Sequence, residues 1–140
     1  MGTDVKFILN AILILCSCGS VKINQCNLCN VGYLKIAENN PNDTNIKNAL
    51  CTMSIRCINN VEFMEYSNEL VFLFLEREAN ITVREISKLS TDMQDFIIDH
   101  VAHPINDGID LNLIRMQFQI LKGKNENENK VIKRILNSLN

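Results

Sequence analysis

The sequence predicts an all-α protein, a small helical bundle stapled by disulfide bonds. Three observations support this fold class. Apolar residues recur at helical spacing along most of the chain, and no segment shows the alternation of a half-buried strand. Capping residues and turns rich in Asn or Pro separate those segments. Four of the six cysteines follow an N-terminal leader, and an even number in an exported chain is typical of a disulfide framework.

Residues 1–20 have the order of a signal peptide. Lys6 precedes an apolar run from Phe7 to Cys16, and small residues follow up to Ser20. The run is too short to span a bilayer comfortably. We therefore expect cleavage near Ser20 and a secreted or lysosome-like, vesicular location. The alternatives are an uncleaved anchor, a buried N-terminal helix, or a bacterial lipoprotein signal whose lipidated residue would be Cys18.

The mature cysteines are Cys26, Cys29, Cys51 and Cys57. A turn at residues 39–43 predicts a helical hairpin between the two cysteine pairs. This geometry favours nested bonds, Cys26–Cys57 outside and Cys29–Cys51 inside. Cys26–Cys51 with Cys29–Cys57 is the second choice, and a local bond within the C-x-x-C motif is the third. A zinc site would need a second close pair and a thioredoxin-like site a βαβ context, so we expect neither.

The chain is divided into a leader (1–20), a stapled helical domain (21–104) and a C-terminal helical extension (105–140). A capping box at Thr82–Glu85 is expected to open one helix of the domain. The polar segment Gly123–Asn129 is expected to be loose. The other helices are expected at 31–38 and 44–57, which form the hairpin, at 61–78, from a cap at Ser90–Asp92 to Pro104, at 111–121 behind Asp110, and at 131–139.

Composition and motifs bear on nucleic-acid binding, on catalysis and on N-glycosylation. A net charge of −2 gives no basic field for nucleic acid, and the chain has no Trp with which to stack bases. His100 and His103 are spaced as a metal pair could be, but histidines at the end of a helix before Pro104 more simply complement the helix dipole, so we expect no metal. Neither has a neighbouring cysteine or serine that suggests a nucleophile, so we expect no enzyme and no cofactor. The chain contains 20 asparagines, and two of them begin glycosylation sequons, at Asn42 and Asn80.

The cysteine spacing resembles the saposin-like family, which includes the amoebapores. Those proteins open with a C-x-x-C, as in Cys26-Asn27-Leu28-Cys29, and their next cysteine follows after a gap similar to the one that precedes Cys57. The segment Thr82–Ile86 is similar to the family segment that carries the fifth cysteine. The resemblance covers about residues 22–93. The family's remaining cysteines would fall near Ser67 or Asn68, Ser87 and Met93, none of which is cysteine here.

The resemblance implies lipid interaction, with the later helices swinging away from the stapled hairpin to expose an apolar run. The alternative is that the run is bundle core and that the protein is a secreted helical ligand, cytokine-like or effector-like, for a protein receptor. A basic run near the C-terminus is either a solvated tail or a contact for anionic lipid; it comprises Lys122, Lys124, Lys130, Lys133 and Arg134. The lipid-contact candidates are Tyr66, Leu70, Phe72, Leu73 and Phe74.

Overall fold

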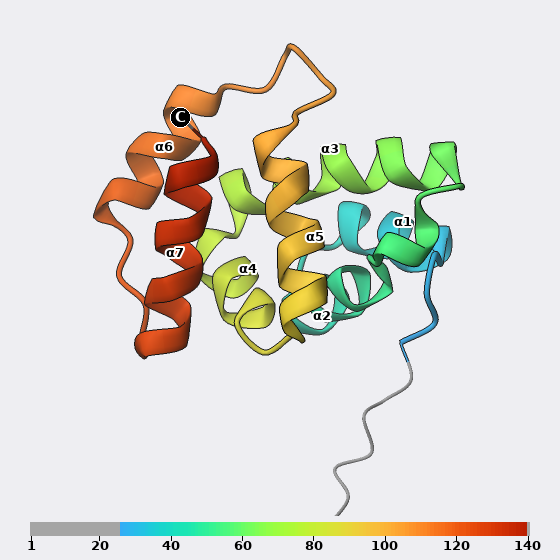
Figure 1. The fold of residues 1–140 in the computed structure, drawn as a ribbon, viewed down its shortest axis with the longest axis horizontal. Helices are drawn as coiled ribbons and strands as arrows, with labels where there is room; N and C mark the ends of the chain where they lie inside the picture. The colour runs from blue at the N-terminus through green and yellow to red at the C-terminus, as the bar shows by residue number, and fades with distance from the viewer. Residues whose placement is uncertain (1–25, 140) are drawn as a thin grey trace, which may run out of the picture.

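The computed structural model describes residues 26–139, so the predicted signal peptide lies outside the described residues. Within that range the chain is helical and contains no strand, which confirms the all-α prediction (Figure 1). The elements in chain order are α1 (Val31–Asn39), α2 (Asp43–Thr52), the 3-10 helix η1 (Ile55–Cys57), α3 (Val61–Arg77), α4 (Ala79–Ile86), α5 (Thr91–Ala102), α6 (Leu111–Ile120) and α7 (Glu126–Ser138).

Asparagine side chains begin four of these helices. Asn30 Oδ1 accepts a hydrogen bond from a backbone N–H in the first turn of α1, and Asn42, Asn60 and Asn125 do the same for α2, α3 and α7. An N-cap acceptor satisfies a backbone donor that has no partner inside the helix, and Asn is among the residues best suited to it. The high asparagine content therefore sets much of the helix spacing.

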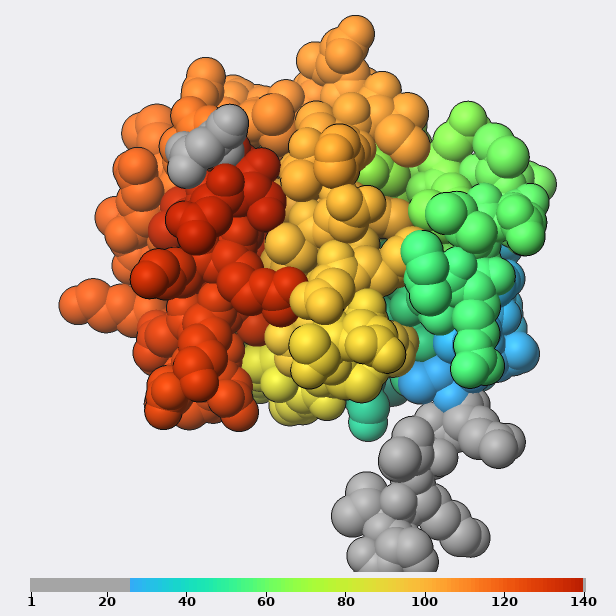
Figure 2. All heavy atoms as spheres, viewed as in Figure 1, coloured from blue at the N-terminus to red at the C-terminus, as the bar shows by residue number. Residues whose placement is uncertain are grey.

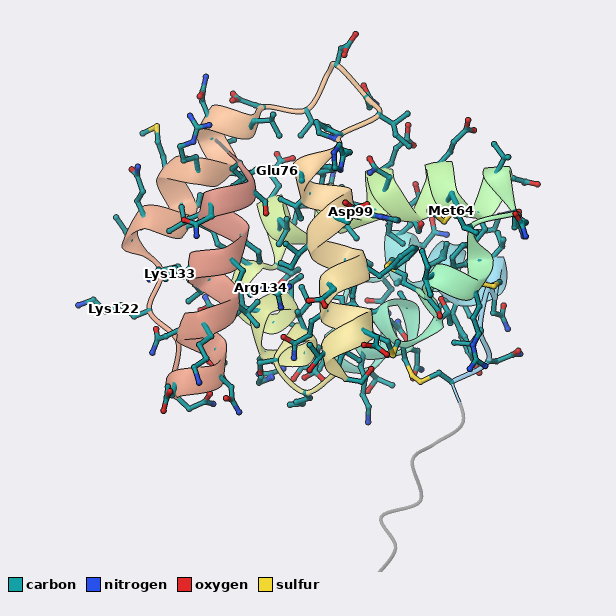
Figure 3. All side chains as sticks on the ribbon, in the orientation of Figure 1. Met64, Glu76, Asp99, Lys122, Lys133 and Arg134 are labelled. Carbon is teal, nitrogen blue, oxygen red and sulfur yellow. A yellow bond between two sulfur atoms is a disulfide. The ribbon has the colours of Figure 1, made fainter. Side chains whose placement is uncertain are left out.

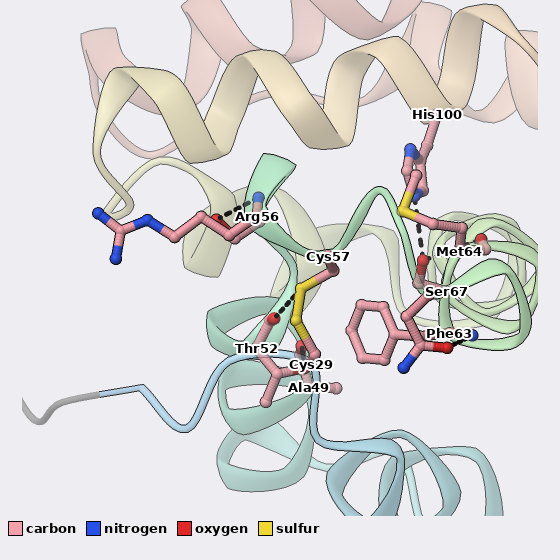
Figure 4. Close-up of a disulfide and its surroundings, with 11 residues drawn as sticks. Cys29, Ala49, Thr52, Arg56, Cys57, Phe63, Met64, Ser67 and His100 are labelled. Atoms are coloured by element: carbon pink, nitrogen blue, oxygen red, sulfur yellow. Dashed lines mark hydrogen bonds between the residues drawn. A yellow bond between two sulfur atoms is a disulfide. The ribbon is translucent and has the colours of Figure 1, made fainter.

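The disulfides join Cys26 to Cys51 and Cys29 to Cys57, with Cα–Cα distances of 5.4 and 5.5 Å. The nested pairing that we favoured is wrong, and the second choice is confirmed. The reason is that α2 ends at Thr52 instead of continuing to Cys57. The chain turns back there, and the Cys29 N–H donates to Thr52 O at 3.0 Å, so η1 returns Cys57 to Cys29 (Figure 4).

Two local predictions also differ from the structure. Thr82 does not cap a helix, because α4 starts at Ala79, directly after α3; the Thr82 hydroxyl instead donates to Glu78 O at 2.8 Å. The segment Gly123–Asn129 is not loose, because Asn125 caps α7. The buried Glu128 carboxylate accepts a hydrogen bond from Lys124 N at 2.7 Å and so fixes the turn.

The core runs through all seven helices of the described range. Helix α7 packs against α4 and α5, and α6 packs against α3 and α7. Figure 2 shows α7 lying directly beside α5 on the visible face. Residues of the expected C-terminal extension therefore share one core with the stapled domain, and the buried ones among them include Ile114, Phe118, Val131, Ile132 and Ile135.

Candidate functional site: a groove beside α3

The apolar run of α3 is mostly core. Leu70 and Phe72 are each 2 % exposed and Phe74 is 0 % exposed, whereas Tyr66 and Leu73 are partly exposed. Helix α3 buries this run against its neighbours because apolar residues occupy every position from Leu70 to Leu75. Lipid contact with Phe74 would require the fold to open.

Four of the five lipid-contact candidates nevertheless meet at one surface cavity of about 270 Å³. Leu70, Phe72 and Leu73 form its apolar lining, and Tyr66 stands beside them. The segment between α5 and α6 forms the opposite wall. We call this cavity the α3 groove. Its remaining lining residues are Glu38 from α1, Glu69 and Glu76 from α3, and Asn106, Gly108 and Ile109 from the segment between α5 and α6.

The rim of the α3 groove is acidic. Its carboxylates are those of Glu38, Glu69 and Glu76, and none of them forms an ion pair with another residue in the range 26–139. Tyr66 donates its hydroxyl hydrogen to Glu38. Burial, the hydrogen bond to Glu38 and the nearby Glu69 charge raise the pKa of Tyr66 to about 12. The groove therefore disfavours an anion and suits a cationic or zwitterionic group beside an apolar chain.

The wall of the groove is fastened to α3 by one buried side chain, Asn68. Its Nδ2 donates to His100 O at 3.1 Å and to His103 O at 3.0 Å, and its Oδ1 accepts from Ile105 N at 3.1 Å. Asn68 is 3 % exposed. Buried amides are stabilising when their donors and acceptors are paired in this way. Asn68 thus fixes the end of α5 and the start of the segment that closes the groove.

A second buried polar contact joins α3 to α5. The Ser67 hydroxyl donates to Met64 O at 3.0 Å, and its oxygen lies 3.0 Å from His100 Nε2, an arrangement that favours the ring tautomer protonated at Nε2 (Figure 4). Burial lowers the pKa of His100, against the opposing charge of Asp99. Ser67 is 0 % exposed, so no substrate reaches its oxygen in this conformation. The contact between Ser67 and the neutral His100 ring therefore joins α5 to α3.

The two sequon asparagines lie on one edge of the molecule. Asn42 and Asn80 are both exposed. An ion pair of 2.6 Å joins Asp43, which follows Asn42, to Arg84, which lies one turn after Asn80 on α4. Asn42 caps α2 through Oδ1, which leaves Nδ2, the atom that carries an N-linked glycan, free of the cap. Glycosylation of both residues remains a prediction.

Within residues 26–139, no helix is long and apolar enough to cross a membrane. In the same range, no group of three or more His, Cys, Asp or Glu side chains is arranged to hold a metal ion. The two disulfides indicate an oxidising environment, either extracellular or in a vesicular lumen.

Sequence reasoning missed Asn68, since nothing in its local pattern distinguishes it from the other asparagines. The glutamates of α3 from Glu62 to Glu76 carry a sequence signal, because their spacing places them on one side of the helix. Compared with models of known protein families, with curated proteins and with solved structures, the chain matches none of them.

Proposed function

We propose that the protein is exported and binds an amphiphilic lipid, whose uncharged or cationic part enters the α3 groove. The observation that carries the proposal is that Tyr66, Leu70, Phe72 and Leu73 line one surface cavity, in which Tyr66 and Leu73 are partly exposed and Leu70 and Phe72 form the buried floor. The saposin-like resemblance in the sequence and the oxidising environment indicated by the disulfides support the same function.

The chemistry of the groove selects the head group. An aromatic ring beside carboxylates attracts a quaternary ammonium through its π face and through charge. Tyr66 beside Glu38 and Glu69 offers that combination. A phosphocholine or trimethylammonium head fits this rim, and a sulfate or free phosphate head does not. The apolar side chain of Leu73 then contacts the adjoining methylenes.

The size of the groove sets how much lipid enters. A volume of about 270 Å³ lies just under the roughly 300–1,000 Å³ of typical ligand pockets. The closed form therefore takes one segment of a lipid. A larger share would reach Leu70 and Phe72 when the wall held by Asn68 moves outward, and α5 to α7 carry no disulfide that prevents this within the described range.

Tyrosine fluorescence tests the proposal directly, because the chain has no Trp and only two Tyr. In a Tyr33→Phe background Tyr66 is the only remaining fluorophore of this kind. Single-chain amphiphiles with equal tails and phosphocholine, trimethylammonium or sulfate heads are titrated below their micelle concentrations. We expect saturable signals with the first two heads and at least about tenfold weaker binding with sulfate, since each like-charge contact near the rim costs about 1 kcal/mol or more.

Matched variants locate the site. Leu73→Ser weakens binding, whereas Ile58→Ser, at a residue that is 56 % exposed and outside the groove, leaves it unchanged. A flat Tyr66 signal with every amphiphile contradicts the lipid function. Equal binding by the Leu73→Ser variant contradicts the assigned groove.

The secreted-ligand alternative has an observation of its own. Glu62, Glu65 and Glu69 border a second cavity of about 350 Å³, next to the α3 groove, and have no ion-pair partner in residues 26–139. A protein partner with a basic surface would match this face. In that case Glu65→Lys with Glu69→Lys abolishes saturable binding to target cells, and the amphiphile titrations stay flat.

A further inference from the structure

Helix α6 carries a stripe of exposed apolar side chains on its outer side. Leu113, Met116 and Ile120 are 41 %, 66 % and 81 % exposed, and their spacing puts them on one face of the helix. The opposite face is buried through Ile114 and Phe118. An amphipathic helix normally presents polar residues to water, so an apolar outer face indicates something that covers it.

The charge at the C-terminal end of this stripe is positive. Lys122 and Lys124 lie two and four residues after Ile120, and Lys133 lies on the neighbouring α7. All three are exposed and have no ion-pair partner in residues 26–139, whereas Lys130 and Arg134 are paired with Glu126 and Asp95. Figure 3 shows Lys122 and Lys133 on the side of the molecule that α6 and α7 form.

The acidic groups nearby do not cancel this charge. The Glu128 carboxylate is buried and accepts hydrogen bonds from the turn before α7, and Glu126 is engaged by Lys130. Asp107 and Asp110 stand at the other end of α6, where Asp110 caps the helix. The stripe is therefore basic at the end where its side chains are most exposed.

We infer that this surface, Met116 and Ile120 with Lys122, Lys124 and Lys133, docks the protein on an anionic membrane. We call it the α6 face. Apolar side chains flanked by lysines are the usual composition of surfaces that lie in the headgroup region, where the chains insert and the ammonium groups meet anionic lipids. The acidic α3 groove excludes the same lipids, so the two sites differ in head-group charge.

A second copy of the chain is a poorer occupant. A stable protein interface takes about 20–30 residues from each partner, and the exposed stripe offers three apolar residues on a helix of 10. Membrane docking needs no such area, because each inserted side chain and each lysine contributes separately.

The α6 face also lies close to the groove along the chain. Ile109 lines the α3 groove, and α6 begins two residues later at Leu111. Docking through α6 would hold the groove near a bilayer from which it takes lipid. In this respect the inference rests on the proposed function, but the surface and its test use different residues and a different lipid.

The test is co-sedimentation of the mature protein with vesicles of phosphatidylcholine alone or of phosphatidylcholine with phosphatidylserine. We expect retention by the anionic vesicles, loss of retention at high salt, and little retention by the neutral vesicles. Met116→Glu and Ile120→Glu reduce binding by about tenfold or more, because a charged side chain cannot enter the headgroup region as an apolar one does. Ile58→Glu, at a similarly exposed residue beyond η1, retains wild-type binding.

The lysines are tested in the same way. Lys122→Gln with Lys124→Gln lowers anionic binding by roughly fivefold for each charge removed, and Lys47→Gln with Arg56→Gln, at exposed residues elsewhere, does not. Thermal unfolding confirms that every variant is folded. If anionic vesicles fail to retain the wild type while Tyr66 still reports amphiphile binding, the α6 inference is overturned and the proposed function stands.

Two further results would overturn the inference. One is equal vesicle binding by Ile120→Glu and the wild type, which would place docking elsewhere. The other is a dimer in sedimentation that Ile120→Glu abolishes, without vesicle binding, which would make a second copy the occupant. Vesicle binding that depends on Ile120 together with a flat Tyr66 titration supports the α6 face and contradicts the groove.

Discussion

The side-chain oxygen of Asn68, on α3, accepts a hydrogen bond from the backbone N–H of Ile105 at 3.1 Å, across 37 residues of chain. The same amide donates to two carbonyl groups at the end of α5. This side chain therefore holds the start of the segment after α5 against α3, where the Asn106 side chain also donates to Glu69 Oε1 at 3.5 Å. That segment supplies Asn106, Gly108 and Ile109 to the wall of the α3 groove.

Replacing Asn68 tests this role. Asn68→Leu keeps the approximate size but leaves the carbonyls of His100 and His103 and the Ile105 N–H without their side-chain partner. We expect a loss of about 2–4 kcal/mol in the free energy of unfolding, measured by urea denaturation. Asn59→Ala, at an exposed position, should change it by less than about 0.5 kcal/mol. Equal losses in the two variants would show that the Asn68 contacts do not stabilise the wall.

The buried His100 predicts a dependence of stability on pH. Burial lowers its pKa from 6.5 in the folded protein. Above pH 6.5 the ring is neutral in both states; below it the unfolded chain takes up a proton before the folded protein does. The free energy of unfolding therefore falls as the pH drops below 6.5, by up to about 1.4 kcal/mol per pH unit, until folded His100 is itself protonated.

Urea denaturation between pH 4.5 and 7.5, chosen as roughly two units below and one above the ordinary histidine pKa, measures this dependence. His100→Gln should flatten the profile in the range where histidine titrates, because glutamine does not titrate. Parallel profiles for the wild type and His100→Gln would show that His100 does not link stability to pH.

The disulfides should differ in their effect when removed. Non-reducing peptide mapping should recover Cys26 linked to Cys51 and Cys29 linked to Cys57. From the sequence separations of 25 and 28 residues, removing either bond should cost about 3–4 kcal/mol. Cys57 is 1 % exposed, so Cys29→Ser with Cys57→Ser also buries a hydroxyl and should cost more than Cys26→Ser with Cys51→Ser. Recovery of Cys26–Cys57 peptides would contradict the fold of η1.

Gly123 is placed where no side chain fits. A Cβ atom there would lie 2.6 Å from Glu128 Cβ and 2.8 Å from Asn129 N. Gly123→Ala should therefore lower the free energy of unfolding by about 1–3 kcal/mol through overpacking. Gly108→Ala is the matched control, because its Cβ would meet only the flexible side chain of Asn106, at 3.1 Å. Thermal unfolding compares the two, and equal midpoints would contradict the close packing of the turn before α7.

The fold class and most helices could be predicted, because apolar periodicity and the Asn- or Pro-rich turns between helices are local signals. The end of α2 could not. Residues 44–57 carry helix-compatible residues, and only the tertiary bond from Cys29 to Thr52 reveals the break. The pattern from Thr82 to Glu85 matches a capping box, which is a local signal. In the structure the Thr82 hydroxyl donates to Phe74 O and Glu78 O, inside a helix that has already begun at Ala79.

The apolar lining of the α3 groove could be predicted from local sequence, whereas its wall could not. The apolar run predicts a set of lipid-contact candidates, but not which of them the rest of the fold buries. The wall depends on Asn68, whose partners lie 32 to 37 residues away in the sequence. No local sequence pattern therefore predicts these contacts.

Mass spectrometry of lipid that stays with the purified protein tests most directly whether an amphiphilic lipid binds in the α3 groove. Wild type, Leu73→Ser and Ile58→Ser are expressed with the leader in eukaryotic cells and purified from the medium without detergent. We expect wild type and Ile58→Ser to carry choline- or ammonium-containing lipid, and Leu73→Ser to carry much less. Wild-type protein that carries no lipid, or only as much lipid as the Leu73→Ser variant, would contradict lipid binding in the α3 groove.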